Sequence, residues 1–133
     1  MAQYSIAVNN ARLDAIETVV GASPKLRIYT GSAPANCAAA ATGTLLVEIQ
    51  LPSDWLAAAS ATSKIKAGTW SATSASAGTA GYYRIVDNAG TTCGIQGVVG
   101  ATASGLEMIL NNIVIGAAQV VTVDTYVINA ANV

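Results

Sequence analysis

Histidine is absent from this chain, and charged residues are scarce. Only 10% of the 133 residues are charged, against about 25% in an ordinary soluble domain. Without histidine, the Ser-His-Asp and Cys-His arrangements cannot be built and the commonest general base is missing. Two cysteines do not fill the tetrahedral shell of a zinc site. We therefore expect no metal and no other cofactor.

The carboxylates are few as well, and they are scattered. None of the seven lies in the D-x-D-x-D-G spacing of a calcium-binding loop. A glycosidase needs two carboxylates that the fold brings together, but Glu48 and Glu107 fall on the polar phases of their predicted strands. Solvated or interfacial carboxylates are expected there. The sequence therefore predicts no catalytic residues and a protein that is not an enzyme. The full set is Asp14, Glu17, Glu48, Asp54, Asp87, Glu107 and Asp124.

Long apolar runs and basic clusters are also missing. The hydrophobic fraction is 53%, but 27 of these residues are alanine, and no stretch approaches the ~18–20 apolar residues of a spanning helix. The first five residues contain no basic segment followed by an apolar run, so we expect no secretory signal and no membrane partner. No nucleic-acid partner is expected either, because the basic residues form no stripe: Arg12, Lys25, Arg27, Lys64, Lys66 and Arg84.

One amphipathic helix is predicted near the N-terminus, from Ser5 to Val20. Gly21 stands where a left-handed C-terminal cap is expected, and Pro24 prevents continuation. Ser5 can cap the start, although Asn9 or Asn10 could cap a shorter helix. The apolar residues that recur at helical spacing are Ile6, Leu13, Ile16 and Val20.

After Pro24 the apolar period changes to two, which indicates strands. The clearest strand signal is 45–51, and Asp87-Asn88-Ala89-Gly90 is typical of a hairpin turn. Seven or eight short strands predict a mainly β fold, an antiparallel sandwich or barrel with an N-terminal α-helix. We expect a helical arm at 1–23 and a β-sandwich domain at 24–133. The other predicted strands are 26–29, 64–70, 81–86, 91–99, 106–110, 113–115 and 120–128.

The connections consist mostly of small, uncharged residues. Segments 31–43 and 71–80 are either mobile surface loops or loops that lie flat against a neighbouring subunit. Pro52, followed by Ser53 or Asp54 as a cap, predicts a short helical turn at 55–59. Cys37 and Cys93 are either small buried thiols or partners in a disulfide formed in an oxidising medium.

The aromatic residues divide into two groups. Trp55 and Trp70 are either core anchors or interface hot spots. Tyr29, Tyr82 and Tyr126 lie on the outward phases of their predicted strands, which favours a contact surface. The N-terminal helix either contacts a partner or packs on its own β-domain. The candidate interface residues are Ile6, Leu13, Ile16, Val20, Tyr29, Trp55 and Tyr82.

Seven short blocks are spread along nearly the whole chain. They are NARLDAIE (10–17), LRIYTG (26–31), PANC (34–37), GTLL (43–46), LPSDW (51–55), GTAGYYRI (78–85) and VDT (123–125). With these blocks the chain resembles small virion structural proteins of tailed bacteriophages and prophages. The resemblance lies in the general run of the sequence and contains no catalytic motif.

The resemblance implies a head decoration or minor capsid protein. Such a protein is made in the bacterial host cytoplasm, binds the major capsid protein and stabilises the shell at the capsid surface of the virion. A homo-oligomer, dimer or trimer, would repeat one modest contact over the lattice. The alternative is a tail or adsorption component whose β-domain binds a host surface glycan or protein.

Overall fold

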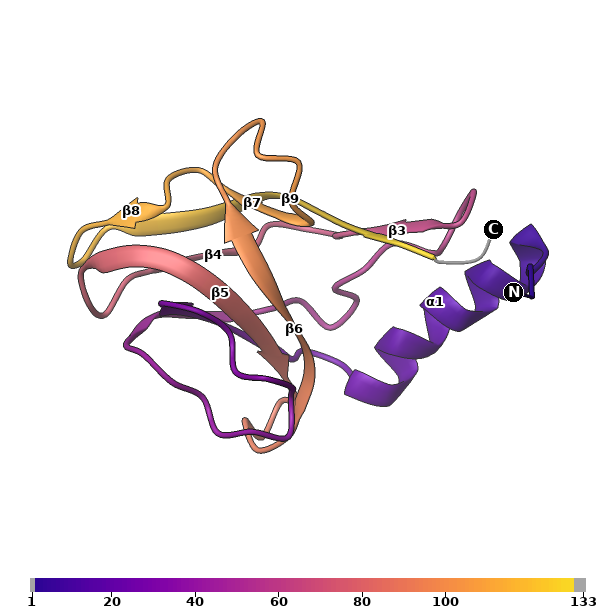
Figure 1. Ribbon diagram of the computed structural model, residues 1–133, viewed down its shortest axis with the longest axis horizontal. Helices are drawn as coiled ribbons and strands as arrows, with labels where there is room; N and C mark the ends of the chain where they lie inside the picture. The colour runs from indigo at the N-terminus through magenta and orange to yellow at the C-terminus, as the bar shows by residue number, and fades with distance from the viewer. Residues whose placement is uncertain (1, 131–133) are drawn as a thin grey trace.

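The computed structural model describes residues 2–130, which contain one helix and nine strands (Figure 1). The prediction of a mainly β fold with an N-terminal helix is confirmed, with slightly more strands than expected. The helix α1 spans Ile6–Val20, and the strands are β1 (Lys25–Thr30), β2 (Leu45–Gln50), β3 (Ser63–Ile65), β4 (Ser71–Thr73), β5 (Gly78–Val86), β6 (Cys93–Gly100), β7 (Met108–Leu110), β8 (Val114–Ile115) and β9 (Val120–Asn129).

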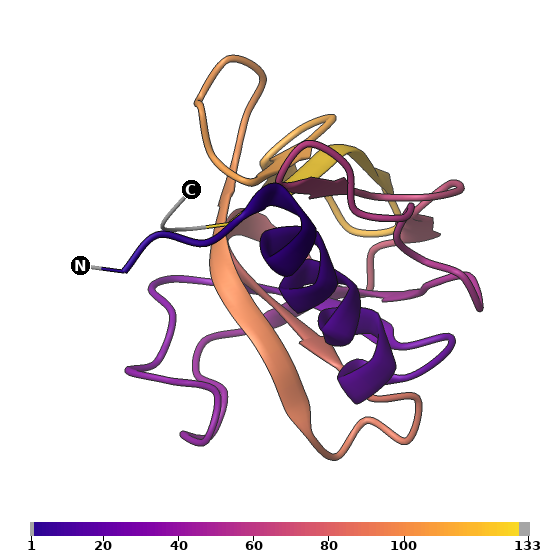
Figure 2. The ribbon, with the colours of Figure 1, turned by 90° about the vertical axis from the view of Figure 1, so that its right-hand side faces the viewer.

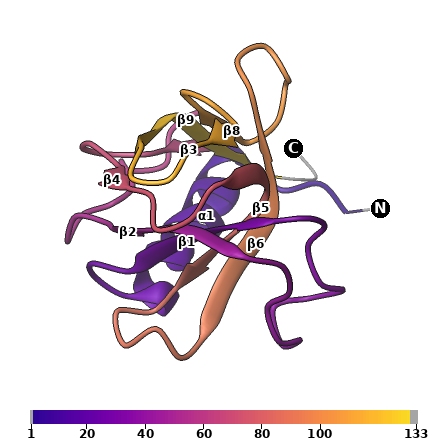
Figure 3. The same cartoon turned by 90° about the vertical axis from the view of Figure 1, so that its left-hand side faces the viewer.

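The strands form one curled sheet in the order β2-β1-β5-β6-β7-β9-β3, with β4 paired to β9 and β8 to β5. All pairings are antiparallel except that of β6 with β7. The curl places β3, β4, β8 and β9 at one level and β1, β2 and β5 at another (Figure 3). The core lies between these levels, and its largest side chains are Trp55 and Trp70, both 0% exposed. The core-anchor interpretation of the tryptophans is therefore confirmed.

The exposure predicted for three tyrosines is wrong, because Tyr29, Tyr82 and Tyr126 are only 8%, 0% and 1% exposed. Tyr29 and Tyr82 do lie on the outward phase of their strands, but they are covered there, whereas Tyr126 lies in the core. Segment 31–43 covers the outer face of β1 and β5, where the Tyr29 and Tyr82 rings stack with centroids 5.0 Å apart. Tyr126 turns inward because the register of β9 against β7 shifts between Ile109 and Leu110. Such a bulge reverses the side-chain phase beyond it.

Other local predictions also need correction. The predicted turn of helix at 55–59 is absent among the described residues, because Leu56 instead forms a β-bridge with Lys66. Segment 71–80 is not a loop, since β4 and the start of β5 lie within it. The strand expected at 64–70 is only the three residues of β3.

The bounds of the helix prediction are confirmed, although Gly21 does not adopt the left-handed α conformation expected of it, and of the four apolar residues expected on one face only Leu13 is buried. Ser5 is the N-cap, and its hydroxyl accepts a hydrogen bond from the Val8 backbone N–H at 3.2 Å. At the other end, the Gly21 N–H donates to the Glu17 carbonyl. Gly21 has a φ of 93°, a conformation that favours glycine. The cap residues visible in the sequence therefore fix both ends of α1.

Candidate functional site

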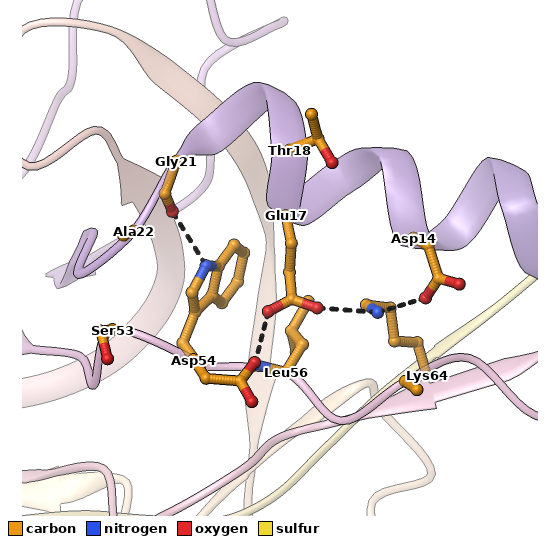
Figure 4. A pocket seen from close by; sticks show the side chains of 11 residues that line it. Asp14, Glu17, Thr18, Gly21, Ala22, Ser53, Asp54, Leu56 and Lys64 are labelled. Atoms are coloured by element: carbon orange, nitrogen blue, oxygen red, sulfur yellow. Dashed lines mark hydrogen bonds and ion pairs between the residues drawn. The ribbon is translucent and has the colours of Figure 1, made fainter.

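A buried ion-pair cluster fastens α1 to the β-domain (Figure 4). Lys64 of β3 is 1% exposed, and its ammonium lies 2.6 Å from Asp14 Oδ1 and 2.8 Å from Glu17 Oε1. Asp14 and Glu17 are three positions apart in the helix, so they lie on the same side of it. The two carboxylates together compensate the charge of the Lys64 ammonium, whose burial without a counter-ion would cost much free energy.

The cluster shifts the pKa values of its members. The hydrogen bond from Lys64, followed by the one from the Ala59 backbone N–H, lowers the pKa of Asp14 below its ordinary value. Burial disfavours the charged form of Lys64, but hydrogen bonds to Asp14 and Glu17 outweigh it and raise the pKa of the ammonium. Asp14 and Lys64 are therefore both charged at neutral pH, and the ion pair between them is intact there.

Further hydrogen bonds join α1 to the segment between β2 and β3. The Trp55 indole donates to the Gly21 carbonyl at 3.1 Å, and the Ala59 N–H donates to Asp14 Oδ1 at 2.9 Å. The Thr62 N–H donates to Asn10 Oδ1 at 3.0 Å. A cleft of about 430 Å³ remains beside these contacts. The helix thus packs on its own β-domain, which is one of the two arrangements considered from the sequence.

The opposite side of α1 carries an apolar stripe. We define the α1 stripe as Val8, Arg12, Ala15 and Val19, which recur at spacings of three and four and so share one face. Val8 is 46% exposed and Val19 is 83% exposed, and Arg12 is the only charged member. Tyr4 and Ile6, 40% and 61% exposed, extend the apolar surface toward the N-terminus.

A groove separates the α1 stripe from β6, which lies beside the helix (Figure 2). Its volume is about 370 Å³, and Ile16, Val20, Gly94 and Ile95 complete its lining. A Cβ on Gly94 would approach Val20 Cγ2 to 2.6 Å, so the glycine permits the helix to approach this strand closely.

The structure divides the predicted interface residues. Ile6 is exposed, and Ile16 and Val20 are half-buried at the groove. The others pack within their own domain and are unavailable to a partner in this fold: Leu13, Tyr29, Trp55 and Tyr82, exposed by 5%, 8%, 0% and 0%. Sequence reasoning missed Val8 and Val19. Their helical spacing is a visible signal, but the sequence predicts a contact face along Leu13 and Ile16 instead.

Comparisons with family models, with curated proteins and with solved structures give no match to this chain. Residues 2–130 contain no group of three or more acidic or cysteine side chains placed to hold a metal ion. In the same residues, no helix has the length and apolar character needed to cross a membrane. The α1 stripe, where exposed apolar side chains border a groove of about 370 Å³, is the candidate contact surface.

Proposed function

We propose that this protein is a structural virion protein of a tailed bacteriophage that binds the major capsid protein and stabilises the capsid shell. The observation that carries the proposal is the α1 stripe, an exposed apolar face on a helix whose other side is fixed by a buried ion-pair cluster. Because the helix is held in place, this face is already ordered when a partner meets it. Preordered surfaces lose less entropy on binding.

The low charge of the chain supports the same role. The α1 stripe and its groove contain one charged residue, Arg12, so packing against a shell would desolvate little charge. A modest contact of this kind gains strength when homo-oligomeric copies engage a lattice together. The blocks that resemble small virion proteins agree with this placement, and they cover α1 itself at 10–17.

The tail-adsorption alternative would use exposed aromatics on which a glycan could stack. Six of the seven aromatic residues are buried, and Tyr4 alone is exposed, at 40%. We therefore place the shell contact first. A cryo-EM map of the virion distinguishes the two locations, because density for this chain on the capsid lattice supports the proposal and density on the tail contradicts it.

Binding to particles that lack the protein tests the surface directly. Burying one exposed valine contributes about 1.5–3 kcal/mol, so we expect V8K/V19K to lose at least ten-fold in affinity. The matched control is V114K/V120K, which alters valines of similar exposure, 62% and 57%, on β8 and β9. β8 and the start of β9 lie at the end of the molecule away from α1 (Figure 1). Equal binding by both variants would contradict the proposal.

A further inference from the structure

Besides the cleft and the groove that border α1, a cavity lies beneath segment 31–43, on the outer face of β1 and β5. Its volume is about 270 Å³, and its lining includes Arg27 of β1, Arg84 of β5, Tyr29 and the alanines of the segment. Arg27 and Arg84 are direct cross-strand neighbours, so the sheet places two cations side by side at this cavity.

Segment 31–43 is held over the cavity by specific contacts. A disulfide joins Cys37 to Cys93 of β6, which decides between the two interpretations of the cysteines. The Gln96 side chain donates to the Pro34 carbonyl at 2.7 Å. The Tyr82 hydroxyl donates to the Thr42 carbonyl at 2.6 Å. Contacts within this chain therefore hold segment 31–43 over the cavity.

Arg84 is a buried cation with only neutral partners among the described residues. It is 6% exposed. Its Nε donates to Gln96 Oε1 at 3.1 Å, and its Nη2 donates to the carbonyls of Asn36 and Ala39 at 3.2 and 2.7 Å. No described carboxylate forms an ion pair with it. A buried charge without a counter-ion is costly.

One end of the Arg84 guanidinium remains available. Nη1 has no acceptor among residues 2–130, whereas every fully buried side-chain nitrogen or oxygen in that range has a partner. Nη1 is therefore not sealed in, and Arg84 lines the cavity. Arg27 also lines it, and the nearby Glu48 neutralises only Arg27, through Nε at 2.7 Å. The cavity thus has an excess of one positive charge.

We propose that this cavity binds a small oxyanion, a phosphate or a carboxylate, between the guanidinium groups of Arg84 and Arg27. Guanidinium donors match the oxygens of such anions in geometry and charge. The available volume accommodates an ion of that size. Binding would supply the counter-charge that the fold does not give Arg84, and it would hold segment 31–43 to β5 through Arg84. This site is separate from the α1 stripe and independent of the proposed function.

The test uses the three arginine Nε–H signals in the NMR spectrum of ¹⁵N-labelled protein. Sodium phosphate and sodium acetate are titrated separately at constant ionic strength, with sodium chloride as the reference. We expect the Arg27 and Arg84 signals to shift along one saturable curve while the Arg12 signal stays nearly fixed. Saturation by phosphate indicates a tetrahedral occupant and saturation by acetate a planar one. Either supports the site.

Two variants make the test specific. R27Q removes one of the two cations without touching Arg84, and we expect its Arg84 signal to need at least ten-fold more anion for half-saturation. K66Q makes the same change of charge at a lysine whose ammonium contacts the Gly68 carbonyl, and it should bind like the wild type. The proposal is overturned if neither anion gives a saturable shift, if Arg12 shifts equally, or if R27Q binds unchanged.

Discussion

Lys64 and Arg84 are two buried cations of the same sheet, and the groups that surround them differ in charge. Lys64, 1% exposed, lies between the carboxylates of Asp14 and Glu17. Arg84, 6% exposed, contacts only carbonyl and amide oxygens. In the first cluster two carboxylates hold the Lys64 ammonium and fix α1. The second cation has no carboxylate partner among the described residues and keeps a free donor beside a cavity. The comparison separates a cation that serves the fold from one placed to meet a ligand.

The largest expected effect comes from removing both carboxylates that compensate Lys64. In D14N/E17Q the ammonium remains buried without a counter-ion, and we expect the free energy of unfolding to fall, because a buried charge that loses its partners is strongly destabilising. Urea denaturation measures the loss. K64M should cost less, because the remaining carboxylates are 50% and 23% exposed and can be hydrated. Wild-type stability in the double variant would show that charge does not hold α1.

The disulfide should matter for the Arg84 region and not for the Lys64 region. The Cys37–Cys93 bond joins residues 56 apart in the sequence, so C37S/C93S is expected to lose about 2–4 kcal/mol of stability. Hydrogen exchange should rise in segment 31–43 and remain unchanged in segment 53–64, which contacts α1. Reducing the wild-type protein should reproduce the pattern. Faster exchange in both regions alike would mean that the two are not independent.

Acid should weaken the Lys64 cluster first. The pKa of Asp14 is lowered in the fold, so its contribution to stability is present above the unfolded pKa and is lost as the pH falls through the folded pKa. Lys64 has a raised pKa, so its contribution is lost only as the pH rises through that value in strong alkali. Circular dichroism melts from pH 6 to pH 2 should show a smaller loss in D14N than in the wild type.

The control for that acid transition is Asp87. Its pKa is also lowered, chiefly by hydrogen bonds from the Thr92 and Thr91 backbone N–H groups. D87N should therefore remove the part of the acid-induced stability loss that comes from Asp87. The double variant D14N/D87N should remove both parts, since the effects of separate sites are expected to add. Identical acid profiles in the wild type and D14N would mean that Asp14 is not stabilised in the fold.

The smallest expected effect is at Glu48. In its ion pair with Arg27, the Arg27 side chain is 25% exposed and the Glu48 side chain is 38% exposed. E48Q should therefore change the free energy of unfolding by at most about 1 kcal/mol. The same substitution removes a negative charge beside the proposed oxyanion site. We expect it to tighten phosphate binding about three-fold, the order of one charge–charge interaction near a hydrated surface. Calorimetric titration measures this gain, and weaker binding in E48Q would count against the site.

Features that depend on neighbouring residues, such as helix ends and turns, could be predicted from the sequence. The ends of α1 follow from Ser5, Gly21 and Pro24, because capping depends on adjacent residues. The hairpin between β5 and β6 follows from Asp87 to Gly90 in the same way. The polar phase predicted for Glu48 was also correct, since it is exposed within β2, whereas Glu107 is exposed but precedes β7. The scarcity of charge and the lack of histidine belong to the sequence as well, and they restrict the chemistry that any site here can use.

Only the tertiary structure decided which side chains are covered. Period two shows that Tyr82 and Arg84 share a face of β5, but not that segment 31–43 lies over that face. The bulge that turns Tyr126 inward depends on the register with β7. The pairing of Lys64 with Asp14 and Glu17 spans about fifty residues, and the Cys37–Cys93 bond spans 56. Contacts so distant in the chain leave no periodic signal, because they arise from how the sheet curls and which loops close over it.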